Sequence, residues 1–156
     1  MGQIEEETEM KIEELEAEWK VDHDLDRTNM QEEFTKIPRL HSKYINYYNQ
    51  EKKVLLDVKS QYDIAYKSVL QKLSYDIGPD KVMSKEERDR NPGGIKPLQK
   101  DVDTFIQADA EIIRLSLRIG LQNIKIDFLK SVMDSISKRH FLVQQLSKHQ
   151  MFEAGN

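Results

Sequence analysis

The chain has 156 residues, of which 38% are hydrophobic and 33% are charged, with only four prolines and six glycines. This balance favours one helical domain, or one domain with an arm, that exposes much charged surface. The absence of cysteine excludes a disulfide framework and a thiolate zinc site, and it suits a reducing compartment.

The first residues do not predict a targeting segment. Glu5, Glu6 and Glu7 stand where a signal peptide needs positive charge followed by an apolar run. Met1-Gly2 begins a myristoylation pattern, but Glu6 stands where that pattern needs Ser or Thr. No uncharged stretch approaches the roughly 20 residues of a membrane span. We therefore expect a soluble protein without membrane attachment.

The net charge of −4 conceals two unequal regions. Residues 1–33 hold thirteen acids and three bases, a net charge of −10, and the other 123 residues hold fifteen acids and twenty-one bases, a net charge of +6. An acidic arm on a basic body suggests a polyanion-binding protein, in which the arm contacts another protein or competes for the basic surface. The alternative is a helical protein whose charges have no nucleic-acid partner.

Residues 9–20 predict a short amphipathic helix with Ile12, Leu15 and Trp19 on one side. A helix of this length is marginal alone, so we expect its Trp19 face to dock on the chain's own body or on another protein. The following segment, Asp22–Asp26, offers carboxylates and one imidazole to a hard cation. No glycine turn or bidentate Glu completes a calcium loop, so we favour a solvated linker with a helix N-cap.

Two helices are predicted next, on either side of a proline. The first, capped by Asp26 or Thr28, carries Met30, Phe34 and Ile37, and Pro38 breaks or bends it. The second runs from Leu40 to about Tyr75 and contains all six tyrosines. Its apolar positions follow steps of three and four with Glu51 as the misfit, and they are Tyr44, Tyr48, Leu55, Val58, Tyr62, Ala65, Val69 and Leu73.

Lysines form a strip beside that apolar seam. At 100° per residue, Lys52, Lys59 and Lys67 fall within an arc of about 80°, with Lys53 at its margin. Such a strip can follow the phosphates of a nucleic acid, and Tyr66 beside Lys67 offers a ring for base stacking. The alternative is an ordinary solvated face with partners four residues apart, such as Lys59 with Asp63.

Residues 77–100 interrupt the helical pattern with Gly78-Pro79, Asn91-Pro92-Gly93-Gly94 and Pro97, and they predict a mobile linker rich in bases. The linker could touch a polyanion or be a polar loop. No strand precedes Gly93-Gly94 and no Gly-Lys-Ser/Thr follows, so a nucleotide site is not expected. The four histidines have no metal-binding spacing, and no Ser or Thr lies in a glycine elbow. We therefore expect no enzyme, no metal site and no cofactor.

The region 101–156 predicts one long helix, from Asp101 to His149, with two apolar ladders at heptad spacing and polar interruptions at Gln122 and His140. A second apolar set, which includes Leu117, Leu121 and Ile124, lies on roughly the opposite face. One partner helix cannot cover both faces, and a helix of this length, roughly 70 Å, exceeds what a chain of this size buries internally. We therefore predict self-association, through Phe105, Ile112, Leu115, Ile119, Ile126, Leu129, Met133 and Ile136.

Several short segments resemble one family. Leu40–Asn46, Lys52-Lys53, and the ending from Ser137-Lys138-Arg139 through Phe152-Glu153-Ala154-Gly155 resemble the UvsY recombination mediators of T-even-like bacteriophages. Lys67 matches a family base, whereas Val69 stands where the family has a second one. The resemblance implies an all-α, ring-like homo-oligomer, expected as a hexamer or heptamer, in the cytoplasm of an infected bacterium. The residues expected to bind DNA are Lys52, Lys53, Lys59, Lys67, Lys138 and Arg139.

The resemblance also implies a function and an organisation. Such a protein binds single-stranded DNA and helps a phage RecA-like recombinase load onto DNA that is coated by the phage single-stranded-DNA-binding protein, during recombination, repair and replication. The expected regions are an acidic arm (1–26), a DNA-binding helical region (27–76), a linker (77–100) and an oligomerisation helix (101–156). The alternatives are a coiled-coil adaptor without nucleic-acid binding and a metal-dependent nuclease that uses Asp22–Asp26.

Overall fold

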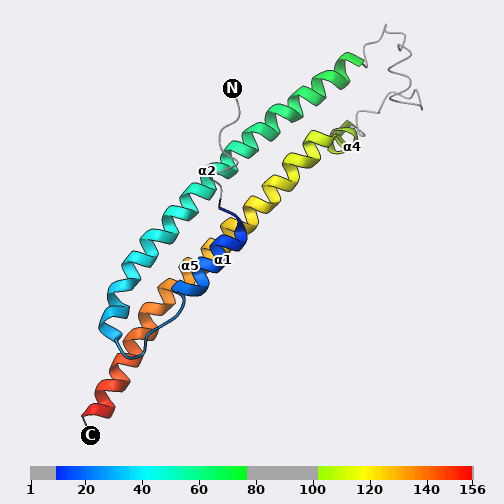
Figure 1. Cartoon of the computed structure of the whole chain (residues 1–156). Helices are drawn as coiled ribbons and strands as arrows, with labels where there is room; N and C mark the ends of the chain where they lie inside the picture. Colours follow the sequence, from blue (N-terminus) through cyan, green and yellow to red (C-terminus); the bar gives the residue numbers. More distant parts are fainter. Residues whose placement is uncertain (1–9, 77–101, 156) are drawn as a thin grey trace. The chain divides into compact units, whose positions relative to one another are not determined.

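A computed structural model describes residues 10–76 and 102–155, and the predicted 77–100 linker lies outside them. The described part of the chain is all-α, as predicted, and it consists of α1 (Ile12–Asp22), α2 (Met30–Asp76), α4 (Val102–Gln107) and α5 (Ala110–Ala154) (Figure 1). None of these helices is both long enough and apolar enough to cross a membrane.

The chain divides into two compact units, and both long helices contribute to each. The first unit combines the residues up to Lys53 with those from Gln122 onward, and the second unit is Val54–Leu121. The first unit therefore contains α1, the beginning of α2 and most of α5. The second unit contains the remainder of α2, α4 and the beginning of α5.

The core of the first unit forms where α1 docks on both long helices. Its buried side chains, each at most 1% exposed, are Leu15, Tyr44, Leu129, Val132 and Ile136. Trp19 packs at the edge of this core, with its ring edge-on to that of Tyr44 at 5.4 Å between centroids. Burying a leucine side chain as fully as Leu15 contributes roughly 1.5–3 kcal/mol. The expectation that the Trp19 face of α1 must dock is confirmed, and its partner is the chain's own body.

Polar contacts hold the same helix in place. The Lys43 ammonium lies 2.8 Å from the carboxylate of Glu18 and 2.7 Å from that of Asp22. The hydroxyl of Tyr44 donates to Asp22 at 2.9 Å, and that of Tyr47 donates to Glu18 at 3.1 Å. Burial and the Asp22 carboxylate raise the pKa of Tyr44, so its hydroxyl remains a donor. The acids of α1 therefore anchor it to α2.

The start and the continuity of α2 differ from prediction. Asn29, rather than Asp26 or Thr28, caps the helix: its side-chain oxygen accepts from the Glu32 amide at 3.2 Å, and its side-chain nitrogen donates to the Glu32 carboxylate at 3.0 Å. Asp26 instead accepts from the amide and the hydroxyl of Thr28 in a local turn. Pro38 lies inside α2, so the predicted boundary there was wrong. The proline lacks an amide for the Phe34 carbonyl, but packing by Ile37 and Leu40 holds the helix on either side.

The single helix predicted from Asp101 is two helices. Asp109 accepts hydrogen bonds from the amides of Glu111 at 2.9 Å and Ile112 at 3.3 Å, and so caps the start of α5. A carboxylate that satisfies these amides replaces the helical bonds they would otherwise make, which separates α4 from α5. The buried side chains of the second unit come from all three of its helices, and they are Leu55, Val58, Ile106, Ile112 and Leu115.

Candidate nucleic-acid interface

The four lysines predicted on α2 are all exposed. Lys52 and Lys53 lie in the first unit, and Lys59 and Lys67 lie in the second. None of them forms an ion pair with another described residue, so the Lys59–Asp63 pair of the alternative interpretation is not formed. Unpaired surface ammonium groups keep their full charge for an external anion. This is the property that a phosphate-binding residue requires.

Two tyrosines accompany these lysines. The Lys52 ammonium lies over the ring of Tyr48, 5.7 Å from its centroid. Tyr66, beside Lys67, is half-buried, and its hydroxyl donates to Asp103 at 2.7 Å. That hydrogen bond raises the pKa of the Tyr66 hydroxyl. The hydrogen bond to Asp103 therefore ties the side chain of Tyr66 to α4.

The neighbouring bases Lys138 and Arg139 have opposite environments. Lys138 is exposed and pairs with Asp134 at 2.6 Å, one turn earlier on α5. Arg139 is only 6% exposed. Its guanidinium donates to the carbonyls of Asp22, His23 and Asp24 at 2.8–3.1 Å and to the Glu33 carboxylate at 2.5 Å.

These contacts give Arg139 a different role from the predicted phosphate contact. Its two terminal nitrogens hold the connection between α1 and α2 against α5, and neither is left for DNA. Burial disfavours the charged form of the Glu33 carboxylate. Hydrogen bonds from Arg139 and Lys36 outweigh this effect and lower the pKa of Glu33. We therefore retain Lys138, and not Arg139, among the candidate DNA-binding residues. Sequence reasoning missed this clasp because its partners are more than 100 positions away along the chain.

The residues predicted for oligomerisation also divide by burial. Ile112, Leu115, Ile126, Leu129 and Ile136 are at most 3% exposed in the single chain, so its own helices already cover them. Ile119 and Met133 are half-buried, and Phe105 is exposed. On the other face, α5 leaves Ile113, Leu117, Leu121 and Ile124 exposed, and further large apolar side chains are exposed toward its end, at Phe141, Leu142, Met151 and Phe152. Periodicity located two apolar faces, but it did not show which one the chain itself uses.

The Asp22–Asp26 segment has structural contacts of its own. Asp22 binds Lys43 and Tyr44, and Asp26 binds Thr28. Within residues 10–76 and 102–155, no three His, Cys, Asp or Glu side chains are grouped so that they could hold a metal ion.

Comparison with known proteins decides the family. A sequence model described as "Recombination, repair and ssDNA binding protein UvsY" matches residues 18–156. The chain belongs to the UvsY family. It is 26% identical over 147 residues to the recombination protein UvsY of Enterobacteria phage T4, which covers 94% of this chain and 99% of that protein.

Solved structures show the same fold. One crystal form of the bacteriophage T4 recombination mediator protein UvsY matches with a TM-score of 0.76 and 24% identity, covering 94% of this chain and 99% of the other. A second crystal form matches with a TM-score of 0.74 and 24% identity, covering 92% and 99%. The helical arrangement described above is therefore that of UvsY.

Proposed function

We propose that this protein is a single-stranded-DNA-binding recombination mediator without catalytic activity of its own. The observation that carries the proposal is the set of four exposed lysines on α2, none paired with another described residue, in a chain of the UvsY family. Lysine is a flexible point charge that contacts phosphate without selecting a base. The protein should therefore bind single strands of any sequence.

Assembly of several copies would make these contacts effective. A few exposed lysines bind DNA weakly, but linked copies engage one strand at high effective concentration. We propose a ring-like homo-oligomer of six or seven copies, supported by the large apolar side chains exposed on α5. Of the residues first predicted for this contact, Phe105 has an exposed side chain, and Ile119 and Met133 are partly accessible.

The mediator role requires protein partners. We propose that the assembly presents its strand to the phage RecA-like recombinase on DNA coated by the phage single-stranded-DNA-binding protein, in the cytoplasm of the infected host. Membership of a recombination and repair family supports this role. The arm is acidic and the lysines of α2 are basic, so we propose that the arm contacts protein partners and the lysines contact DNA.

Titration of fluorescently labelled oligo-dT at two salt concentrations tests the proposal. A mediator that neutralises phosphates with lysine should bind at low salt and lose affinity steeply as salt rises, because bound counterions are released. A coiled-coil adaptor should show no salt-sensitive binding, and that result would overturn the proposed function. Native mass measurement with and without oligo-dT gives the number of copies in the same samples.

A further inference from the structure

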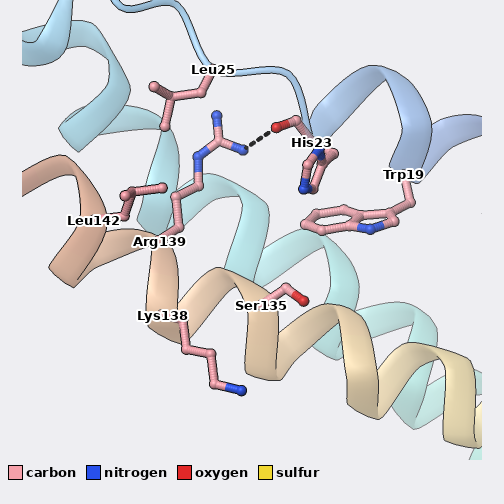
Figure 2. Close-up of a pocket in the computed structure, with 7 residues that line it drawn as sticks. All are labelled: Trp19, His23, Leu25, Ser135, Lys138, Arg139 and Leu142. Atoms are coloured by element: carbon pink, nitrogen blue, oxygen red, sulfur yellow. Dashed lines mark hydrogen bonds between the residues drawn. The ribbon is translucent and has the colours of Figure 1, made fainter. Parts of the chain in front are cut away.

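A small cavity opens in the first unit between α5 and the connection that joins α1 to α2. Its volume is about 270 Å³, and it is lined by Trp19, His23, Leu25, Ser135, Lys138, Arg139 and Leu142. Figure 2 shows the indole of Trp19 on one side and Leu25 and Leu142 on the other, with Arg139 between them and Lys138 at an edge. This volume lies below the roughly 300 Å³ at which small-molecule pockets begin. The cavity has room for one large side chain of a partner, which is called the guest below.

The chemistry of the lining favours a protein guest that carries both an apolar group and an acceptor. Trp19, Leu25 and Leu142 form apolar walls, and Trp and Arg are enriched where a partner's side chain anchors an interface. The side chain of Lys138 is 77% exposed, and its ion pair with Asp134 is exposed too, so the ammonium can turn to a new carboxylate.

The end of α5 supplies a matching guest. Phe152 is 74% exposed, and the carboxylate of the next residue, Glu153, lies 3.5 Å from the exposed imidazole of His149. Gln150 binds the Arg27 carbonyl, and beyond it the helix extends past the turn between α1 and α2 (Figure 1, red). Phe152 follows Lys138 by fourteen positions on one helix, a separation of about 20 Å. The ring therefore cannot enter the cavity of its own chain.

We propose that Phe152 of one copy fills this cavity in a neighbouring copy and that the adjacent Glu153 is held by Lys138 at the edge of the cavity. This inference rests on the homo-oligomer of the proposed function. Ring and cavity are different surfaces of each chain, so the contact is head-to-tail when each copy offers its Phe152 to the next copy. A contact of this kind closes into a ring when its rotation allows. The arrangement gives the exposed end of α5 a specific position in the assembly.

A mixing experiment tests the pairing. Phe152→Ala removes the guest, and Leu142→Glu places a charge in the cavity at a side chain that is 52% exposed in the free chain. Sedimentation velocity should show each variant alone in smaller species than the wild-type chain. An equal mixture should form larger species than either variant, because one intact cavity meets one intact Phe152. Phe141→Ala, an exposed phenylalanine outside the cavity, should keep the wild-type size. Wild-type assembly by both variants, or a mixture no larger than its components, would overturn the proposal.

Trp19 provides a local measurement, because it is the only tryptophan in the chain and it lines the cavity. A synthetic peptide of residues 145–155, added to the full chain carrying Phe152→Ala, should change Trp19 fluorescence in a saturable manner. The same peptide with Phe152→Ala, or a chain that also carries Leu142→Glu, should bind at least tenfold more weakly. If the peptide, its Phe152→Ala form and the Leu142→Glu chain all give the same affinity, or if no peptide binding is seen, the pairing is refuted even when oligo-dT binding is normal. Loss of salt-sensitive oligo-dT binding by the wild-type chain would count against the proposed function instead.

Discussion

The lysines of α2 and Arg139 of α5 are all positively charged, but their environments differ. Lys52, Lys53, Lys59 and Lys67 are exposed and make no ion pair with another described residue, whereas Arg139 is buried among three backbone carbonyls and Glu33. Both sets are basic residues that the sequence places near helical apolar seams. The exposed lysines are therefore available to bind an external anion, whereas Arg139 stabilises the fold. Substitutions in the two sets should therefore affect different measurements.

Arg139→Ala should produce the largest loss of stability. The substitution leaves the Glu33 carboxylate buried without its main partner and releases the carbonyls of Asp22, His23 and Asp24. Removing one member of a buried ion pair costs about 3–5 kcal/mol. Urea unfolding followed by circular dichroism measures the change. Lys138→Ala, next to it but exposed, should change stability by less than about 0.5 kcal/mol. If both variants unfold at the wild-type midpoint, Arg139 does not hold the α1–α2 connection.

Gln122→Leu should have the next largest effect. Gln122 and Glu51 are both buried, and the Gln122 amide donates to the Glu51 carbonyl at 2.9 Å and to its carboxylate, with Lys125 at 3.5 Å. Without the amide, a buried acceptor loses a donor, at a cost of about 1–3 kcal/mol. The double variant Glu51→Leu/Gln122→Leu should recover part of that loss, since neither buried polar group is then left unmatched. Chemical unfolding of Gln122→Leu, Glu51→Leu and the double variant gives the coupling energy between the two residues, and purely additive losses would contradict it.

The same contacts show where sequence reasoning succeeds. Heptad and three-four spacing identified Glu51 and Gln122 as polar interruptions of apolar seams, and the structure pairs them with each other. Their pairing depends on how two helices are aligned, which no local pattern encodes. The cap at Asn29 was accessible, because Asn29 with Glu32 three positions later follows the capping-box spacing. Asp109 before an apolar run was a similar signal for the start of α5.

Other features could not be read from the sequence. Apolar spacing found both faces of α5, but which face is internal depends on where α1 and α2 pack. Pro38 predicted an interruption from its missing amide, and tertiary packing on both sides of it outweighed that local preference. The role of Arg139 depends on carbonyls far away in sequence, and charge alone placed it with the DNA-binding residues. For the candidate interface, the sequence predicted which lysines to consider, and the structure showed which of them form no ion pair with another described residue.

Glu33→Gln should change how the stability of the fold depends on pH, which separates the buried ion pair from the exposed lysines. Because the pKa of Glu33 is lowered in the folded chain, its contribution to stability is present above the unfolded pKa and is lost as pH falls through the folded value. The wild-type chain should therefore lose stability as the solution is acidified below the ordinary carboxyl range. The Gln variant should be less stable at pH 7 and should lose less on acidification. Thermal unfolding between pH 3 and 7 gives both curves, and parallel curves would contradict this role for Glu33.

The exposed lysines should give the smallest individual effects, seen in DNA binding and not in stability. Lys52→Ala, Lys59→Ala and Lys67→Ala should each weaken binding to any single-stranded sequence to a similar extent, because an ammonium group reads charge and not bases. Each loss should flatten the slope of log affinity against log salt by roughly 0.7 for every phosphate contact removed per bound subunit. Unfolding midpoints should remain at the wild-type value, since none of the three makes an internal ion pair with a described residue. Lys11→Ala, an exposed lysine at the start of α1, is the matched control and should leave both affinity and slope unchanged. If the three variants keep the wild-type slope while Lys138→Ala reduces it, the strand follows α5, and the lysines of α2 serve only to keep the surface charged.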